Sequence, residues 1–339
     1  MVFVTGGTGL LGSHVLFKLA ENNFEILASK RPNSNVERVR KVFSYYSNKA
    51  DALFEKIKWV DVALEEYHEI EPVLEGIDCV YHCSGFVSFQ KKDEELLKVA
   101  NEIVTTNLLN ACLNKGIRVF CHVSSIATIN NNDYTGELHE GVFWKTSGDE
   151  SYYGITKYNA EREVWRASEE GLNVVIVNPA VILAPGFWGQ SSGKLIAFCH
   201  KGRLFYTEGV TGYVDALDVA TIMLELVKEK KFNNRYIVLE GMYSFKEIFS
   251  MIQSEFGKNP PRLKAPTFLL KMGVFFDSTL SKLTGKTQIL TKETVTSAIA
   301  TKKLSNQKIL NDLKFTYRPI KSSIHSICTI FKAEKKLKF

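Results

Sequence analysis

The chain has 339 residues, of which 45% are hydrophobic and 24% charged, and its formal net charge is +6. This length favours one large domain with a smaller lobe. No apolar run reaches the roughly 20 residues that span a bilayer, and the modest charge, part of it in the basic tail 332–339, does not form a nucleic-acid patch. These properties argue against a membrane-spanning protein and against a nucleic-acid-binding one.

Strand-like residues begin at Val2, so we expect no secretory signal and a cytoplasmic protein. The six cysteines form no CxxC pair and most lie in apolar stretches. Because disulfides are rare in the cytosol, we expect reduced core residues. His82, Cys83 and His122 lack the usual spacing of zinc ligands, and no metal site is predicted.

Apolar strand-like runs alternate with amphipathic stretches of helix length. Strands separated by helices indicate a parallel sheet covered by helices on both faces, and nearly continuous apolar strands match that burial. The predicted fold class is therefore α/β, a doubly wound parallel sheet. The predicted strands are 2–6, 24–30, 57–62, 78–85, 118–125 and 173–182, and the predicted helices are 10–22, about 93–115 and about 153–170.

The pattern loosens after Pro185. Residues 185–194 form a loop rich in Gly and Ser, and the chain from about Ser244 predicts mostly short helices. One more helix at 216–230 and one more strand at 234–241 lie between them. We predict a large domain of residues 1–184, to which 213–240 return, and a smaller, mostly helical substrate lobe of residues 185–212 and 241–339.

The sequence FVTGGTGLLGSH, residues 3–14, separates the first strand from the first helix. Gly7, Gly9 and Gly12 spell G-x-G-x-x-G, whereas Gly6, Gly9 and Gly12 spell G-x-x-G-x-x-G, and both patterns can hold a phosphate. The free N–H groups and positive dipole of a helix start suit a pyrophosphate. The stretch therefore predicts an NAD(P)-binding Rossmann fold, with Thr8, Leu10 and Leu11 also at the cofactor.

The end of the second strand favours NADP(H) over NAD(H). An NAD site usually has an acid there for the ribose hydroxyls. This chain has Lys30 and Arg31 instead, which match a 2′-phosphate, although they could also be a solvated loop end. NAD(H) remains the alternative. Further predicted contacts are Asp61 and Val62 at the adenine, and Cys83, Ser84 and Gly85 at the ribose and pyrophosphate.

Hydride transfer to a carbonyl also needs a proton donor. Of thirteen tyrosines, Tyr45 and Tyr153 have a lysine four residues later, one helical turn away. Tyr153 follows the strand that ends in Ser124 and Ser125, near the predicted cofactor, whereas Tyr45 is expected at the surface. A tyrosine whose pKa of about 10 is lowered by Lys157 could supply the proton.

These motifs resemble the extended short-chain dehydrogenases/reductases of the NAD-dependent epimerase/dehydratase superfamily over nearly the whole chain. The segments TGGTGLLG, NEIVTTNLLNAC, VSS, YYGITK and NPAVILAPG occur in that family's order, and the pattern is most similar to reductases of the dihydroflavonol type. Of the two glycine patterns, the resemblance indicates the one formed by Gly6, Gly9 and Gly12. Thr105 stands where the family usually has Gly.

The resemblance implies a role for each matching residue. Tyr153 would be the acid/base, Lys157 its activator, Ser125 the hydroxyl that polarises the substrate oxygen, and Asn101 an organiser of the site. Pro179, Ala180 and Val181 would flank the nicotinamide, and Phe86 would line the substrate pocket with Ser125 and Tyr153. A homodimer through the helices that start near Asp93 and Tyr153 is also implied.

Three functions follow. The first is an NADP(H)-dependent oxidoreductase that reduces a small-molecule carbonyl or oxidises the alcohol. The second is a nucleotide-sugar epimerase or dehydratase with tightly bound NAD, against which the missing acid argues. The third is a non-catalytic nucleotide-sensing protein, against which the retained Tyr153 and Lys157 argue.

Overall fold

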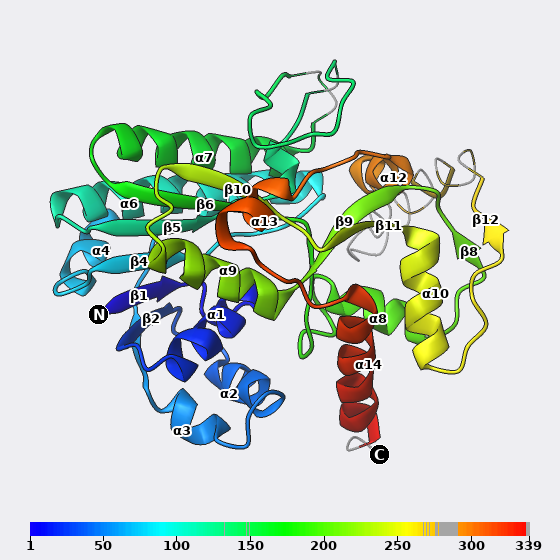
Figure 1. The fold of residues 1–339 in the computed structure, drawn as a ribbon, viewed down its shortest axis with the longest axis horizontal. Coiled ribbons are helices and arrows are strands. Elements are labelled where there is room, and N and C mark those ends of the chain that lie inside the picture. The colour runs from blue at the N-terminus through cyan, green and yellow to red at the C-terminus, as the bar shows by residue number, and fades with distance from the viewer. Residues whose placement is uncertain are drawn as a thin grey trace.

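Seven strands form one sheet in the computed structural model, which describes residues 1–131, 133–146, 148, 150–266, 268, 270, 272–274, 277 and 291–336 (Figure 1). The sheet order is β10-β6-β5-β4-β1-β2-β3, and every neighbouring pair is parallel. The strands are β1 Val2–Thr5, β2 Ile26–Lys30, β3 Ile57–Asp61, β4 Cys79–His82, β5 Val119–Val123, β6 Asn173–Pro179 and β10 Asn234–Val238.

The strand order reverses at β1. The chain runs from β1 through β2 to β3 at one edge and then returns to β4 on the other side of β1. In doubly wound sheets, ligands bind beyond the carboxyl ends of the strands at such a reversal. The fold class predicted from the sequence is confirmed, and it places the glycine turn after β1 at this crevice.

Helices cover both faces of the sheet because successive side chains of each buried strand point to opposite faces. Val2 and Val4 of β1 join the core beneath α1 and α9, whereas Phe3 joins the core beneath α4, α6 and α7. The helices of this part are α1 Leu10–Glu21, α2 Val36–Ser44, α3 Ala50–Phe54, α4 Tyr67–Val73, α5 Glu94–Leu97, α6 Val104–Asn114, α7 Tyr152–Glu169 and α9 Ala216–Lys228.

Two predicted elements are subdivided. The helix expected at about 93–115 consists of α5 and α6 joined by a π-helical turn, Lys98–Ile103. The strand expected at 173–182 ends at Pro179, and Val181–Leu183 continue as β7 in a different sheet. Periodicity alone does not reveal either break, since the apolar pattern continues across both.

The rest of the chain forms two small sheets and mostly helices. A three-stranded sheet has the order β11-β9-β7, and β12 pairs with β8. The domain boundaries at residues 184, 212 and 240 stay a prediction. The further strands are β8 Phe205–Tyr206, β9 Val210–Asp215, β11 Gly241–Ser244 and β12 Leu263–Lys264, and the helices are α8 Gly193–His200, α10 Phe245–Glu255, α12 Lys292–Ile299, α13 Gln307–Leu313 and α14 Ile320–Lys336.

The C-terminal helix α14 packs against the end of α2. Glu334 of α14 accepts hydrogen bonds from the hydroxyl of Tyr45 and, over 3.0 Å, from the indole N–H of Trp188, and it pairs with Lys41 at 3.0 Å. Tyr45, which we expected at the surface, is half-buried by these contacts. These contacts hold α14 against Lys41 of α2 and against Tyr45, the residue that follows α2.

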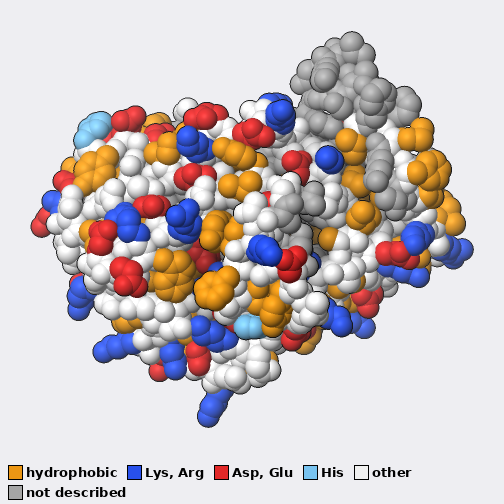
Figure 2. Space-filling model, turned by 90° about the horizontal axis from the view of Figure 1, so that it is seen from above, with side chains coloured by type: hydrophobic (Ala, Val, Ile, Leu, Met, Phe, Trp, Pro, Cys, Tyr) orange, Lys and Arg blue, Asp and Glu red, His pale blue; other side chains and the backbone are white. Residues whose placement is uncertain are grey.

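The surface in Figure 2 carries basic and acidic side chains interspersed over the whole face, so the net charge of +6 is not gathered there into one basic region. Across the described part of the chain, no helix combines the length and the apolar character that crossing a membrane requires.

Candidate functional site

The glycine turn after β1 brings the backbone into close contact with itself and with β4. Gly6 has φ +67°, and a Cβ there would lie 2.6 Å from the carbonyl carbon of Cys83. A Cβ on Gly12 would lie 2.1 Å from the carbonyl oxygen of Gly6. Gly9 is the N-cap of α1 and provides no side-chain cap. The first N–H groups of α1, at Leu10 and Leu11, thus keep their capacity for an anionic ligand, and this turn fits a dinucleotide pyrophosphate.

The cations after β2 differ in their surroundings. The Lys30 ammonium pairs with the Asp61 carboxylate at 2.6 Å, beside the buried Val62. Arg31 is exposed, and its guanidinium has no hydrogen bond or ion pair to any described residue. Arg31 is therefore a cation at this end of the sheet that is open to a ligand.

A buried hydrogen-bonded chain lies between the glycine turn and the helix of Asn101. The Thr5 hydroxyl receives the N–H of Ser84 over 3.3 Å and donates to His82 Nδ1 over 2.7 Å. Thr105 donates its hydroxyl proton to the Asn101 carbonyl over 2.6 Å, so the 2.9 Å contact requires His82 Nε2–H as donor. Burial, and secondarily the Lys157 charge, lower the pKa of His82 to about 3, so the imidazole is neutral.

Asn101 lies in the π-helical turn, where the altered helix geometry accompanies its inward position. Its amide oxygen accepts the N–H of Phe86 over 2.8 Å, and its amide N–H groups reach the Phe86 carbonyl at 3.1 Å and the Thr156 hydroxyl at 3.0 Å. A Cβ on Gly85 would lie 3.1 Å from the same amide oxygen. Asn101 thus fixes the loop after β4 beside α7.

Ser125, Tyr153 and Lys157 come together at the carboxyl end of β5. The Ser125 hydroxyl lowers the pKa of the nearby Tyr153 phenol, and Ser125 accepts the N–H of Ala127 at 3.1 Å. Lys157 is 4% exposed and donates from Nζ to the Val123 carbonyl over 2.7 Å. Ser124 donates to Glu161 instead.

Burial controls the proton affinities here. It lowers the pKa of Lys157 to about 8, against the opposing pull of Glu161 and Cys83. Burial also raises the pKa of Tyr153, and the nearby Ser125 hydroxyl offsets only part of that rise. We expected Lys157 to lower the pKa of Tyr153; in this state the direction is upward, because the buried phenolate is poorly solvated.

Two further predicted contacts, Cys83 and Gly85, lie beside Lys157, and a Cβ on Gly85 would lie 3.9 Å from its Nζ. The Phe89 ring meets the Tyr153 ring edge to face, with centroids 6.1 Å apart, and burial raises the pKa of Cys83 to about 12. Ala180 donates its N–H to the Val238 carbonyl over 3.0 Å, where the chain leaves Pro179 for Val181. The described residues include no group of three or more His, Cys, Asp or Glu side chains that could hold a metal ion.

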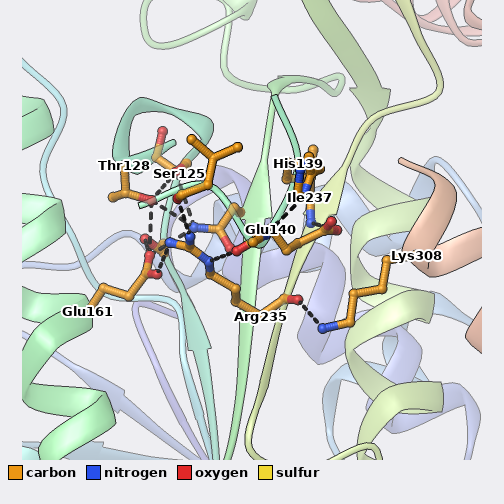
Figure 3. Close-up of polar contacts among 12 residues, drawn as sticks. Ser125, Thr128, His139, Glu140, Glu161, Arg235, Ile237 and Lys308 are labelled. Atoms are coloured by element: carbon orange, nitrogen blue, oxygen red, sulfur yellow. Dashed lines mark hydrogen bonds and ion pairs between the residues drawn. The ribbon is translucent and has the colours of Figure 1, made fainter. Parts of the chain in front are cut away.

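The sequence did not single out a buried ion pair behind Ser125. Glu161 of α7 and Arg235 of β10 meet at 3.1 Å, with Thr128 and Ser125 beside them (Figure 3). One signal was available. Glu161 stands four residues after Lys157 and eight after Tyr153, on the same face of the helix.

Comparison with known proteins identifies the family of the chain. Residues 2–238 match the model of the NAD dependent epimerase/dehydratase family. "Sterol demethylase protein B" of Methylococcus capsulatus is 27% identical, covering 79% of this chain and 78% of the relative. Dihydroflavonol 4-reductase of Dianthus caryophyllus is 24% identical, covering 78% and 75%.

The fold has close counterparts among solved structures. UDP-glucose 4-epimerase of Thermotoga maritima has a TM-score of 0.76 and 18% identity, covering 98% of this chain and 99% of the other. At that identity the likeness concerns the fold alone. The family match, the glycine turn and the doubly wound sheet together identify the chain as a member of the NAD dependent epimerase/dehydratase family, an NAD(P)-dependent oxidoreductase of the extended short-chain dehydrogenase/reductase type.

Proposed function

We propose that the protein is an NADP(H)-dependent oxidoreductase that reduces a small-molecule carbonyl or oxidises the corresponding alcohol. The observation that carries this proposal is the group formed by the buried Ser125 and Lys157 with the half-buried Tyr153 at the carboxyl end of β5. Reductases among the relatives, such as dihydroflavonol 4-reductase, support the reaction class.

Each residue has a distinct task in this proposal. The nicotinamide, when bound, supplies the hydride. Tyr153 donates its phenolic proton to the substrate oxygen, and Ser125 donates a hydrogen bond to the same oxygen. Lys157, with its pKa of about 8, is mostly an ammonium at neutral pH. In this proposal its positive charge, one helical turn from Tyr153, stabilises the negative charge that develops on the phenolic oxygen as the proton leaves. Asn101 keeps the loop after β4 in place.

A nucleotide-sugar epimerase or dehydratase is the second candidate, and the match to the NAD dependent epimerase/dehydratase family is the observation in its favour. Two sequence features oppose it. No acid follows β2, and Ile126 and Ala127, rather than an Asp–Glu pair, follow Ser125.

A screen of aldehydes, ketones and nucleotide sugars, monitored by NADPH absorbance, tests the reaction class. We expect NADPH consumption with at least one aldehyde or ketone and none with nucleotide sugars. Tightly co-purifying NAD together with epimerisation of a nucleotide sugar would replace the reductase by the epimerase.

Arg31→Ala is expected to weaken NADPH binding by about 10- to 100-fold, the value of a charge-assisted hydrogen bond to a phosphate. NADH binding should change little because NADH lacks that phosphate. The measurement is a fluorescence titration of both nucleotides. Arg118→Ala is the matched control, since Arg118 is an exposed arginine that pairs with Asp78 beside the amino ends of β4 and β5. Equal binding of NADPH and NADH by the unmodified protein would reject the NADP preference.

We also propose a cytoplasmic homodimer. The free thiols of all six cysteines suit a reducing compartment. Leu96, Ile103 and Ile155, which are exposed apolar side chains of α5, the π-helical turn and α7, support the pairing of these helices with a second copy.

A further inference from the structure

The Glu161 carboxylate is 2% exposed, and its two oxygens have different partners. Oε2 accepts hydrogen bonds from Ser124 at 2.7 Å, Thr128 at 3.0 Å and Asn178 at 2.8 Å. Two of these donors flank Ser125 in the chain, and Asn178 also approaches the Ser125 carbonyl at 3.3 Å. One oxygen of Glu161 therefore fixes the turn that holds the Ser125 hydroxyl.

The other oxygen faces Arg235, whose guanidinium does more than neutralise it. Arg235 lies on β10, the edge strand, and its Nη1 meets Glu161 Oε1 at 3.1 Å. Its Nε donates to the Glu140 carbonyl and its Nη2 to the Val142 carbonyl, each over 2.8 Å. The planar fork of arginine can hold three acceptors in fixed directions in this way.

A second contact, in addition to those of the Arg235 guanidinium, holds the segment 139–142 against β10. The Glu140 carboxylate accepts the N–H of Ile237, two residues along β10 from Arg235, over 2.9 Å. Lys308 donates to the Arg235 carbonyl over 3.1 Å, and this hydrogen bond further restrains β10 (Figure 3). The loop between β5 and α7 is thus fastened to the edge of the sheet on the side of the Ser125 turn.

A buried ion pair of this kind contributes little net stability, because the desolvation of two charges offsets their attraction. Its donors and acceptors do impose one geometry, since each unpaired group would be costly. The desolvation cost of the Glu161–Arg235 ion pair and its location next to the Ser125 turn indicate that the pair positions its neighbours rather than stabilising the fold.

We propose that Glu161 and Arg235 are a positioning pair that fixes Ser125 and the 139–142 segment at the reaction site without touching substrate or cofactor. This inference rests on the proposed function, because Ser125 is its target. The pair takes no part in binding the dinucleotide, since no contact of Glu161 or Arg235 involves the glycine turn or the end of β2.

The negative charge of Glu161 affects the pKa of Lys157, so the pair should influence how activity depends on pH. The carboxylate raises the pKa of Lys157, one turn earlier on α7, against the effect of burial. Its removal should lower that pKa and move the alkaline loss of activity to lower pH. The titratable and charged groups around the Lys157 ammonium are Tyr153, Glu161, Cys83, His82, His122 and, behind Glu161, Arg235.

The test compares Glu161→Gln, which removes the charge, with Arg235→Lys, which keeps the charge but loses the fork. Both should lower kcat by about 10- to 100-fold, as expected for a small misplacement of a reacting group, and leave KM for NADPH within about 2-fold. The alkaline limb of kcat/KM should move to lower pH only in Glu161→Gln. Glu163→Gln is the matched control, because Glu163 forms a half-buried ion pair with Arg166 on the same helix and has no contact with Ser124, Thr128 or Arg235 among the described residues.

Hydrogen exchange of residues 125–129 and 139–142 gives a readout that needs no turnover. Faster exchange of both segments in the two variants than in Glu163→Gln supports the proposal, even if the unmodified protein reduces no carbonyl and the proposed function fails. The positioning proposal would be overturned if the two variants matched Glu163→Gln in hydrogen-exchange rates, in kcat and in the pH at which kcat/KM falls on the alkaline side. If Glu161→Gln does not fold, Glu161→Asp, which keeps the carboxylate but shortens its reach, carries the exchange and kcat comparison.

Discussion

Tyr153→Phe is expected to lower kcat by about 10²- to 10⁴-fold, the usual contribution of a positioned general acid. The substitution removes one oxygen from a ring that stays packed against Phe89, and that oxygen is the proposed proton donor. The dissociation constant for NADPH should stay within about 2-fold, because the ring and Lys157 remain in place. Steady-state kinetics and nucleotide titration measure the two effects separately.

Tyr152→Phe is the matched control for this variant. Tyr152 precedes Tyr153 at the first position of α7 and loses the same atom. Turnover by Tyr153→Phe at the rate of Tyr152→Phe would show that another group donates the proton. A large loss of NADPH affinity in Tyr153→Phe would assign the tyrosine to binding instead.

Gly12→Ala is expected to lower the free energy of unfolding by about 3 kcal/mol, at the upper end of the cost of overpacking. The new methyl group would lie 2.1 Å from the Gly6 carbonyl oxygen, and backbone cannot move aside as a flexible side chain can. Moving α1 away from β1 should also abolish measurable NADPH binding, because the start of that helix is the predicted pyrophosphate site.

Urea unfolding and nucleotide titration check the Gly12 prediction. Gly189→Ala is the control, since a Cβ at Gly189 would meet nothing within 4 Å and the residue has an ordinary φ. Equal unfolding midpoints for the two variants would mean that α1 adjusts without cost. In that case the close approach of α1 to the turn would not be what fixes the site.

Local patterns predicted the sheet and the glycine turn, and they also led to the assignment of Tyr153 and Lys157, which stays a prediction. Each depends on residues close in sequence: Gly6, Gly9 and Gly12 within one turn, and Tyr153 and Lys157 within one helical turn. The order of strands and helices then placed these segments at one end of the sheet. The choice of Ser125 stays a prediction as well, and Ser124 has a different partner, Glu161.

The features that the sequence did not predict depend on partners distant in the chain. Glu161 and Arg235 are 74 residues apart, and Tyr45 and Glu334 are 289 apart. No periodicity relates such positions, and a buried charge is recognised only when its partner is known. The pairing of Lys30 with Asp61 is of the same kind and left Arg31 as the exposed cation.

The hydrogen-bonded chain from Thr5 through His82 to Thr105 couples two buried positions that are 23 residues apart. In Thr105→Gly, His82 would lose the acceptor of its Nε2–H and leave a buried donor unpaired. Replacing one of the two residues alone is therefore expected to destabilise the protein more than replacing both together with apolar residues of similar shape.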